Sequence, residues 1–81
     1  MPTLALPTPA AYAYYYASQY EKAIQDWTIA VDGLGNPAFA LLGRAKAKWL
    51  SGQKEDACND FKKAILLYKA LEEKKEFIAC D

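Results

Sequence analysis

The sequence predicts an all-α protein, an α-α superhelix of two helix–turn–helix repeats followed by a long or capping C-terminal helix. Three observations lead to this fold class. Residues 10–31 match residues 44–65 in type at an offset of 34 positions, and a period of this length is typical of stacked helical hairpins. Apolar residues recur every three to four positions, as on one face of an amphipathic helix. No run of residues has the alternating pattern of a β-strand.

The repeat is carried by residues that recur in type one period apart. The identical pairs are Ala11 and Ala45, Ala13 and Ala47, Gln19 and Gln53, Glu21 and Glu55, Ala23 and Ala57, Asp26 and Asp60, and Ala30 and Ala64. The similar pairs are Tyr15 and Trp49, Ser18 and Gly52, Trp27 and Phe61, and Val31 and Ile65. Alanines let helix backbones approach closely, and large aromatic residues fill the space between neighbouring helices.

The composition fits one small helical domain at residues 9–80. Of the 81 residues, 53% are hydrophobic and 25% are charged, and the net charge is zero. A neutral chain gives no sign of binding nucleic acid or an anionic membrane, and no apolar run reaches the roughly 18–20 residues of a spanning helix. Residues 1–8 contain prolines and no Lys or Arg, so they are expected to form a flexible lead-in rather than a signal peptide.

The first repeat is expected at about 4–37. Its first helix would run over about 9–17, because Thr8 is a good N-cap and proline is favoured at the first helical position. After a tight turn, the second helix would run over about 20–34. Its apolar positions, Ala23, Ile24, Trp27, Ala30, Val31 and Leu34, have amphipathic spacing. Gly35, Asn36 and Pro37 would then end it.

The second repeat is expected at about 38–70, with a C-terminal helical extension at 71–80. Its first helix would run over about 37–51, capped by Asn36 and closed by Gly52. No Gly or Pro follows Gly52, and residues 69–79 are strong helix formers. The expectation is therefore one unbroken helix over about 54–79. A short break near 69–71, followed by a separate capping helix, is the alternative.

The two cysteines, Cys58 and Cys80, are expected to be free thiols. They are 22 residues apart, which in one continuous helix amounts to about 33 Å, whereas a disulfide requires Cα atoms within about 7 Å. Free thiols are typical of a reducing compartment, so the expected location is the cytoplasm. A Cys80–Cys80 bridge between two oxidised chains is the alternative.

Over about residues 4–70 the chain resembles the tetratricopeptide repeat family. The resemblance rests on Ala11, Tyr14, Ala23, Trp27, Ala30 and Asn36-Pro37 in the first repeat, and on residues 44–48, Gly52, Ala57, Phe61 and Ala64-Ile65 in the second. The chain departs from the family pattern in three ways. Pro7 and Pro9 shorten the first helix, Ser18 stands where glycine is usual, and the closing proline of the second repeat is missing.

The resemblance implies a concave groove, lined by the first helix of each repeat, that binds extended peptides. The matching positions are Thr8, Tyr12, Tyr15 and Tyr16, with Phe39, Leu42, Lys46, Trp49 and Leu50. Aromatic residues are frequent anchors at protein interfaces. The alternative is that these rings pack against one another, against Phe77 and Ile78, or across a dimer contact. The family branch that grips chaperone carboxyl termini is not matched, because Thr8, Tyr12 and Gly43 replace its polar residues.

Catalysis is not expected from this set of residues. The chain has no histidine, the commonest general base, and two cysteines cannot close a zinc site. Gly33 and Gly35 indicate the end of a helix rather than a phosphate-binding loop. Arg44, Lys46 and Lys48 are expected to be solvated and not to form one basic patch. The recurrence of Asp26 and Asp60 one period apart indicates a structural or surface position.

The sequence therefore predicts a non-catalytic, cytoplasmic protein-interaction module: an adaptor, co-chaperone or assembly factor without a cofactor. Two repeats bury less apolar surface than the roughly three usually needed. A homodimer is expected for this reason, with Leu71, Phe77 and Ile78 of the last helix packing against a partner chain. The alternative function is a structural, self-assembling repeat unit or an engineered repeat fragment with no separate ligand.

Overall fold

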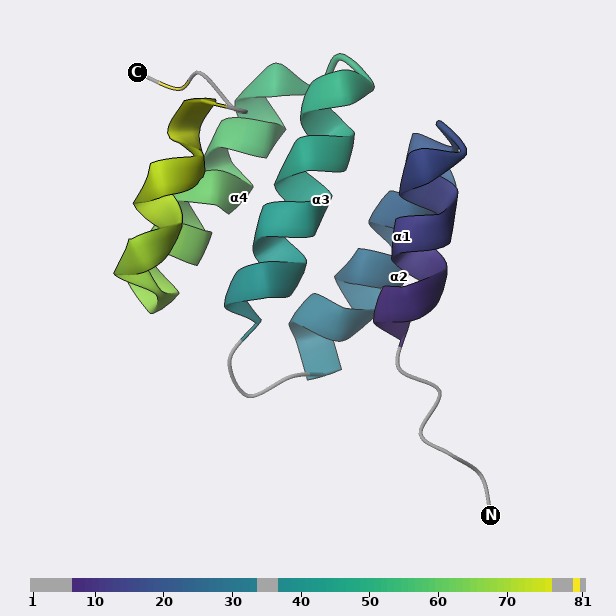
Figure 1. Cartoon of the computed structure of the whole chain (residues 1–81), viewed down its shortest axis with the longest axis horizontal. Coiled ribbons are helices and arrows are strands. Elements are labelled where there is room, and N and C mark those ends of the chain that lie inside the picture. Colours follow the sequence, from purple (N-terminus) through teal and green to yellow (C-terminus); the bar gives the residue numbers. More distant parts are fainter. Residues whose placement is uncertain (1–6, 34–36, 77–79, 81) are drawn as a thin grey trace.

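The computed structural model describes residues 7–33, 37–76 and 80, and the side chains of 11–33, 37–73 and 80. These residues form helices and no strand (Figure 1), which confirms the all-α prediction. The helices are α1 (Pro7–Tyr16), α2 (Tyr20–Gly33), α3 (Ala38–Leu50), α4 (Lys54–Leu67) and the 3-10 helix η1 (Lys69–Glu76). No helix in the described ranges is long and apolar enough to cross a membrane.

The helices form two antiparallel hairpins that stack through α3. Helix α1 packs against α2, α3 against α4, and α2 against α3. Figure 1 shows α1, α3 and η1 in the nearer row, with α2 and α4 behind them. Helix α3 is therefore the central element, and η1 covers the end of the stack beside α4.

The 34-residue period is reproduced in the helix boundaries and the turns. Helix α4 begins and ends one period after α2, and α3 ends one period after α1. In the first turn, the N–H of Ser18 donates to Tyr15 O at 3.0 Å and that of Gln19 donates to Tyr14 O at 2.8 Å. The same two bonds recur in the second turn, from Gly52 to Trp49 O and from Gln53 to Lys48 O. Each turn is thus a Schellman helix end.

Both turns need a left-handed residue at the same position. Ser18 has φ +63° and Gly52 has φ +94°. The repeat that places serine opposite glycine in the sequence therefore places the same backbone conformation in both turns.

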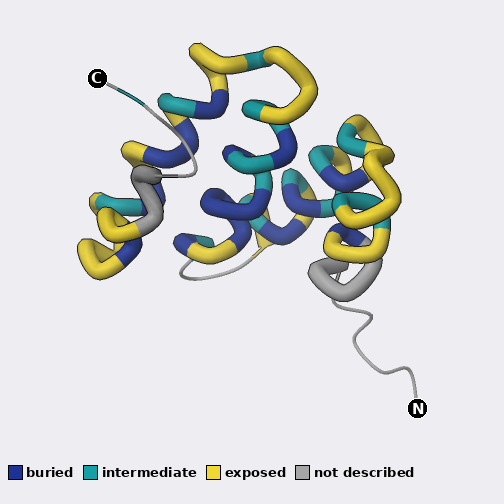
Figure 2. Tube along the Cα trace, turned by 45° about the horizontal axis from the view of Figure 1, so that its top comes forward, coloured by how far each residue is buried: buried dark blue, intermediate teal, exposed yellow. Residues whose placement is uncertain are grey.

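Two buried clusters lie on opposite sides of α3. One, between α3, α4 and η1, contains Ala38, Leu41, Leu42, Ala45, Phe61, Ala64 and Leu71. The other, between α1, α2 and α3, contains Ala11, Ala23, Trp27, Ala30, Ala40 and Ala47. Figure 2 shows that buried positions concentrate along α3 and on the sides of its neighbours. Alanines at period-related positions allow this close approach.

The prediction of one unbroken helix over 54–79 is wrong. The structure is nearer to the alternative of a separate capping helix, but the break is at Tyr68 rather than at 69–71, and the helix after it is a 3-10 helix. Helix α4 ends at Leu67, because Tyr68 is extended with φ −149° and ψ 97°. This break lets η1 turn back beside α4 and bury Leu71, which is 3% exposed, in the cluster with Phe61. Tertiary packing of Leu71 therefore overrides the local helix propensity of the segment.

The expectation of free thiols is also wrong, because it depended on the unbroken helix. With the chain turned back after α4, Cys58 and Cys80 form a disulfide with a Cα–Cα distance of 5.6 Å. A Cys80–Cys80 bridge between chains is incompatible with this pairing. The argument for a reducing compartment therefore loses its premise.

Candidate interaction surface

Helices α1 and α3 each carry large side chains on one side that is open to solvent. Residues 39, 46 and 50 lie on one side of α3, seven and four positions apart, while Ala40 and Leu41 point to the packed sides. Tyr12 and Tyr16 occupy the matching side of α1, one period before Lys46 and Leu50. These five residues, Tyr12, Tyr16, Phe39, Lys46 and Leu50, are called the first-helix face below.

Four large apolar or aromatic side chains of the first-helix face are open to solvent. The exposed fraction is 42% for Tyr12, 78% for Tyr16, 60% for Phe39 and 53% for Leu50. Lys46 is half-buried between them along the chain. Scattered exposed apolar residues are ordinary, but this group recurs on one side of two neighbouring helices.

On α1 the rings support one another. Tyr12 and Tyr16 are stacked with centroids 6.3 Å apart, and Tyr12 packs edge-on against the buried Trp27 at 5.2 Å. Tyr15 contacts Tyr16 at 5.3 Å, Trp27 at 5.9 Å and Tyr20 at 6.0 Å. Trp27 thus anchors a layer of tyrosines whose outer members reach solvent. Such edge-on and offset contacts fix ring orientations in advance.

Burial of Tyr15 in this layer changes its titration. The pKa of Tyr15 is raised above its usual 10.0, first by burial and then by the neighbouring phenols of Tyr20, Tyr16 and Tyr12. The neutral phenol is therefore favoured in the folded protein.

On α3 the face gains a residue that the sequence reasoning missed. The ring of Phe39 packs edge-on against Tyr68 at 5.6 Å, and Tyr68 is 47% exposed. Tyr68 could not be placed there while α4 was expected to continue beyond it. Its extended backbone brings it beside the start of α3.

Three residues predicted to line the groove pack inside the protein instead. Leu42 is buried in the cluster with Phe61, and Trp49 packs against the same cluster, with Lys54 Nζ 5.0 Å from its ring centroid. Tyr15 belongs to the layer on Trp27. The side chains of Thr8, Phe77 and Ile78 lie outside the described residues. Leu71 is buried within its own chain, so it cannot form the predicted dimer seam.

Arg44 and Lys48 are not solvated, contrary to the expectation from sequence. Arg44 donates through Nε and Nη2 to both oxygens of Asp60, at 2.7 and 3.0 Å, and Lys48 Nζ lies 3.1 Å from the same carboxylate. Arg44 Nη1 also donates to Thr28 Oγ1 at 3.1 Å. Asp60 is 3% exposed. This network joins α2, α3 and α4, and the four-residue spacing of Arg44 and Lys48 was the available signal.

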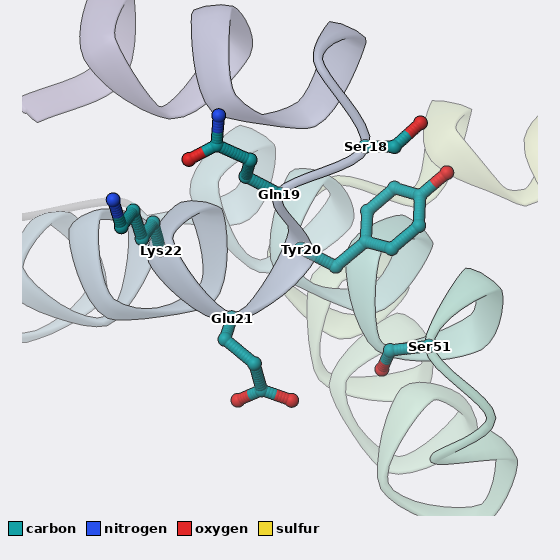
Figure 3. A pocket seen from close by; sticks show the side chains of 6 residues that line it. All are labelled: Ser18, Gln19, Tyr20, Glu21, Lys22 and Ser51. Carbon is teal, nitrogen blue, oxygen red and sulfur yellow. The ribbon is translucent and has the colours of Figure 1, made fainter.

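A shallow hollow of about 340 Å³ lies where the two turns meet (Figure 3). In Figure 3 the ring of Tyr20 extends toward the side on which Ser18 lies, while Lys22 points the other way. Gln53 Nε2 donates to Ser51 Oγ at 3.0 Å and to Glu21 Oε2 at 3.4 Å. The bond to Glu21 links the second turn to the start of α2, and the hollow gives no argument for a ligand. In the described part of the chain, no three His, Cys, Asp or Glu side chains are grouped to hold a metal ion.

No family model matches the chain, and no curated protein or solved structure matches it either. The resemblance to tetratricopeptide repeats therefore stays a prediction from the residues.

Proposed function

We propose that this chain is a non-catalytic protein-interaction module of the tetratricopeptide type, an adaptor, co-chaperone or assembly factor. It binds an extended peptide, or an extended segment of a partner protein, along the first-helix face. The observation that carries the proposal is the exposure of large side chains on α1 and α3, from 42% for Tyr12 to 78% for Tyr16, with Tyr16 and Leu50 one period apart.

The chemistry of this face favours a partner with apolar side chains. Tyr12, Tyr16, Phe39 and Leu50 offer ring faces and one aliphatic group. Tyrosines bury much apolar area while ordering few torsions, and they keep a hydroxyl for hydrogen bonding. Because Tyr12 already packs on Trp27, part of the ordering cost of binding is met before a partner arrives.

The test is a peptide selection followed by titration of matched variants. Peptides enriched on the purified protein are titrated against the Tyr16→Ala and Leu50→Ala variants. The control variants, Ile29→Ala and Leu66→Ala, remove exposed apolar groups from α2 and α4, where these residues are 61% and 86% exposed. We expect about a tenfold weaker affinity, or more, for each first-helix variant and unchanged affinity for the controls. Equal losses in all four variants would contradict the proposal.

The competing role is a structural unit that assembles with copies of itself. Leu66, Leu67 and Tyr68 are consecutive and exposed at the end of α4, and consecutive exposed apolar residues favour association. Light scattering across a dilution series separates the two roles. A protein that stays monomeric and binds peptide supports the interaction module. A homodimer that persists on dilution and does not bind peptides supports the structural role.

A further inference from the structure

The C-terminal helix occupies the position of an incomplete third repeat. Shifted back by one period, η1 begins at residue 35 and ends at residue 42, so it overlaps the first turns of α3. Figure 1 places it in the same row as α1 and α3, beside α4. It has 8 residues, whereas α3 has 13. Helix η1 therefore covers α4 as α3 covers α2, but with a shorter element.

The face of α4 in contact with this C-terminal segment repeats the face of α2 that holds α3. It comprises Cys58, Phe61, Ala64 and Ile65, which lie one period after Ile24, Trp27, Ala30 and Val31. Leu71 and Cys80 pack into the cluster that contains this face. A first helix of a further repeat would meet the same kind of surface that α3 meets on α2.

In the part of η1 whose side chains are described, little besides the disulfide holds the helix in place. Leu71 is its only buried side chain in the described range 69–73. Burial of one leucine is small compared with the conformational entropy lost on ordering an eight-residue segment. The Cys58–Cys80 bond removes much of this cost, because it ties the end of the segment to α4.

The opposite end of the stack carries no such cover among the described residues. Ala13 of α1 is exposed, and it lies one period before Ala47 of α3. Ala47 is fully buried against Trp27 and its neighbours. Helix α1 therefore presents outward the small side chain that α3 uses to pack against the preceding repeat.

We infer that the Cys58–Cys80 disulfide locks this protein against head-to-tail stacking with a second copy. A dithiol reductant opens the bond by two thiol–disulfide exchanges. The protein gains two thiols, and the reductant becomes a cyclic disulfide. Helix η1 then leaves α4, and α1 of a second copy packs on Phe61 and Ala64 as α3 packs on Trp27 and Ala30. Such a head-to-tail contact does not close on itself, so it continues beyond a dimer.

The first experiment is sedimentation velocity of the full chain, oxidised and reduced, over a range of concentrations. The oxidised protein is expected to stay at its monomer mass of 9.0 kDa. The reduced protein, and a Cys58→Ser/Cys80→Ser variant without reductant, are expected to form species beyond dimers as concentration rises. A reduced protein that stays monomeric at all concentrations would overturn the inference.

Matched variants then test which surfaces meet. Ala13→Arg should abolish stacking of the reduced protein, whereas Gln25→Arg, on the exposed side of α2, should leave it unchanged. In a Cys58→Ser/Cys80→Ser/Ala13→Arg variant the α4 surface is free to bind, but the α1 surface is blocked by the arginine. In oxidised wild type the α1 surface is free and the α4 surface is covered by η1. A mixture of the two proteins should therefore form 1:1 pairs and nothing larger. Larger species in this mixture, or equal effects of the two arginine variants, would contradict the stacking geometry.

Circular dichroism checks that each arginine variant is still helical. If Ala13→Arg has lost its helical signal, Ala13→Glu is tested instead, with Gln25→Glu as its matched control. The Tyr16→Ala variant separates this inference from the proposed peptide binding. It should stack normally after reduction, because its counterpart one period later, Leu50, stays 53% exposed where α3 packs on α2.

Discussion

Gly43 of α3 lies directly against the indole of Trp27 on α2. A β-carbon on Gly43 would clash with Cε2 of the ring and lie 2.8 Å from Nε1. The two helices therefore approach as closely as they do because position 43 has no side chain. Trp27 is 1% exposed and anchors the tyrosine layer of α1, so this contact also supports the first-helix face.

Replacing Gly43 by alanine should destabilise the protein by about 1–3 kcal/mol, because overpacking forces the Trp27 ring or α3 to move. The matched control is Gly33→Ala, since nothing lies within 4 Å of a β-carbon at Gly33. It should be neutral or stabilise by up to about 1 kcal/mol. Urea unfolding followed by tryptophan fluorescence measures both changes. Equal stabilities of the two variants would show that the close contact is absent.

Exchanges at the two turns should have opposite effects on stability. Ser18→Gly should stabilise by up to about 1 kcal/mol, because glycine adopts the left-handed conformation without steric cost. Gly52→Ala should destabilise by about 1–2 kcal/mol for the same reason. Thermal unfolding of both variants checks the sign of each change. A loss of stability in Ser18→Gly would mean that the Ser18 side chain stabilises the fold by more than its left-handed backbone destabilises it.

Removal of the Asp60 carboxylate should destabilise the protein by about 3–5 kcal/mol, because Arg44 and Lys48 would keep their partly buried charges without a partner. The control is Asp26→Ala, one period earlier, where Ala10 and Tyr14 replace the two cations in the sequence. We expect Asp26→Ala to change stability by less than about 1 kcal/mol. Chemical denaturation of both variants gives the comparison, and similar losses would contradict the structural role of the network.

Reduction of the disulfide should lower stability by about 3 kcal/mol, the chain-entropy value for a loop of this length. The effect of Leu71→Ala should depend on this bond. In the oxidised protein it should cost about 2–3 kcal/mol, because Leu71 is buried. After reduction it should cost almost nothing, because η1 has left α4. Unfolding curves of the four species form the required cycle, and an additive result would show that η1 stays docked without the bond.

Stability should fall at alkaline pH, and Tyr15 should contribute to the fall. Because folding raises the pKa of Tyr15 above 10.0, its contribution is complete below the unfolded pKa and is lost as pH rises through the folded pKa. Unfolding free energies between pH 8 and pH 11 should therefore decrease less in Tyr15→Phe than in the wild type. An identical decrease in both proteins would remove Tyr15 from the explanation.

The repeating part of the fold was predicted well, because the 34-residue period of the sequence arises from local helix and turn preferences. The Ser18 and Gly52 turns, the buried alanines and most helix ends follow from residue types and spacing. Helix α1 begins at Pro7 rather than at the predicted residue 9, so Thr8 lies inside the helix instead of capping it. The C-terminal segment was mispredicted because its local propensity favours a continuous helix. Burial of Leu71 and the bond from Cys58 to Cys80 are long-range effects, and no local pattern reveals them.

The candidate surface was predicted in part for a related reason. The resemblance to tetratricopeptide repeats implied Tyr12, Tyr16, Phe39 and Leu50 as groove positions, and these four side chains are exposed. Leu42 and Trp49 differ from them in direction by only a fraction of a turn, and the neighbouring α4 decides that they are covered. The role of Arg44 was missed because its partner Asp60 lies on another helix.

The most direct test of the central claim is to map a bound peptide on the protein by nuclear magnetic resonance. A selected peptide is titrated into ¹⁵N-labelled protein, and the amide shifts are compared between helices. We expect the largest changes at Tyr12, Tyr16, Phe39 and Leu50, with little change on the outer sides of α2 and α4. Shifts concentrated around Gln25, Ile29 and Asn59 instead would contradict the claim that the first-helix face binds the partner.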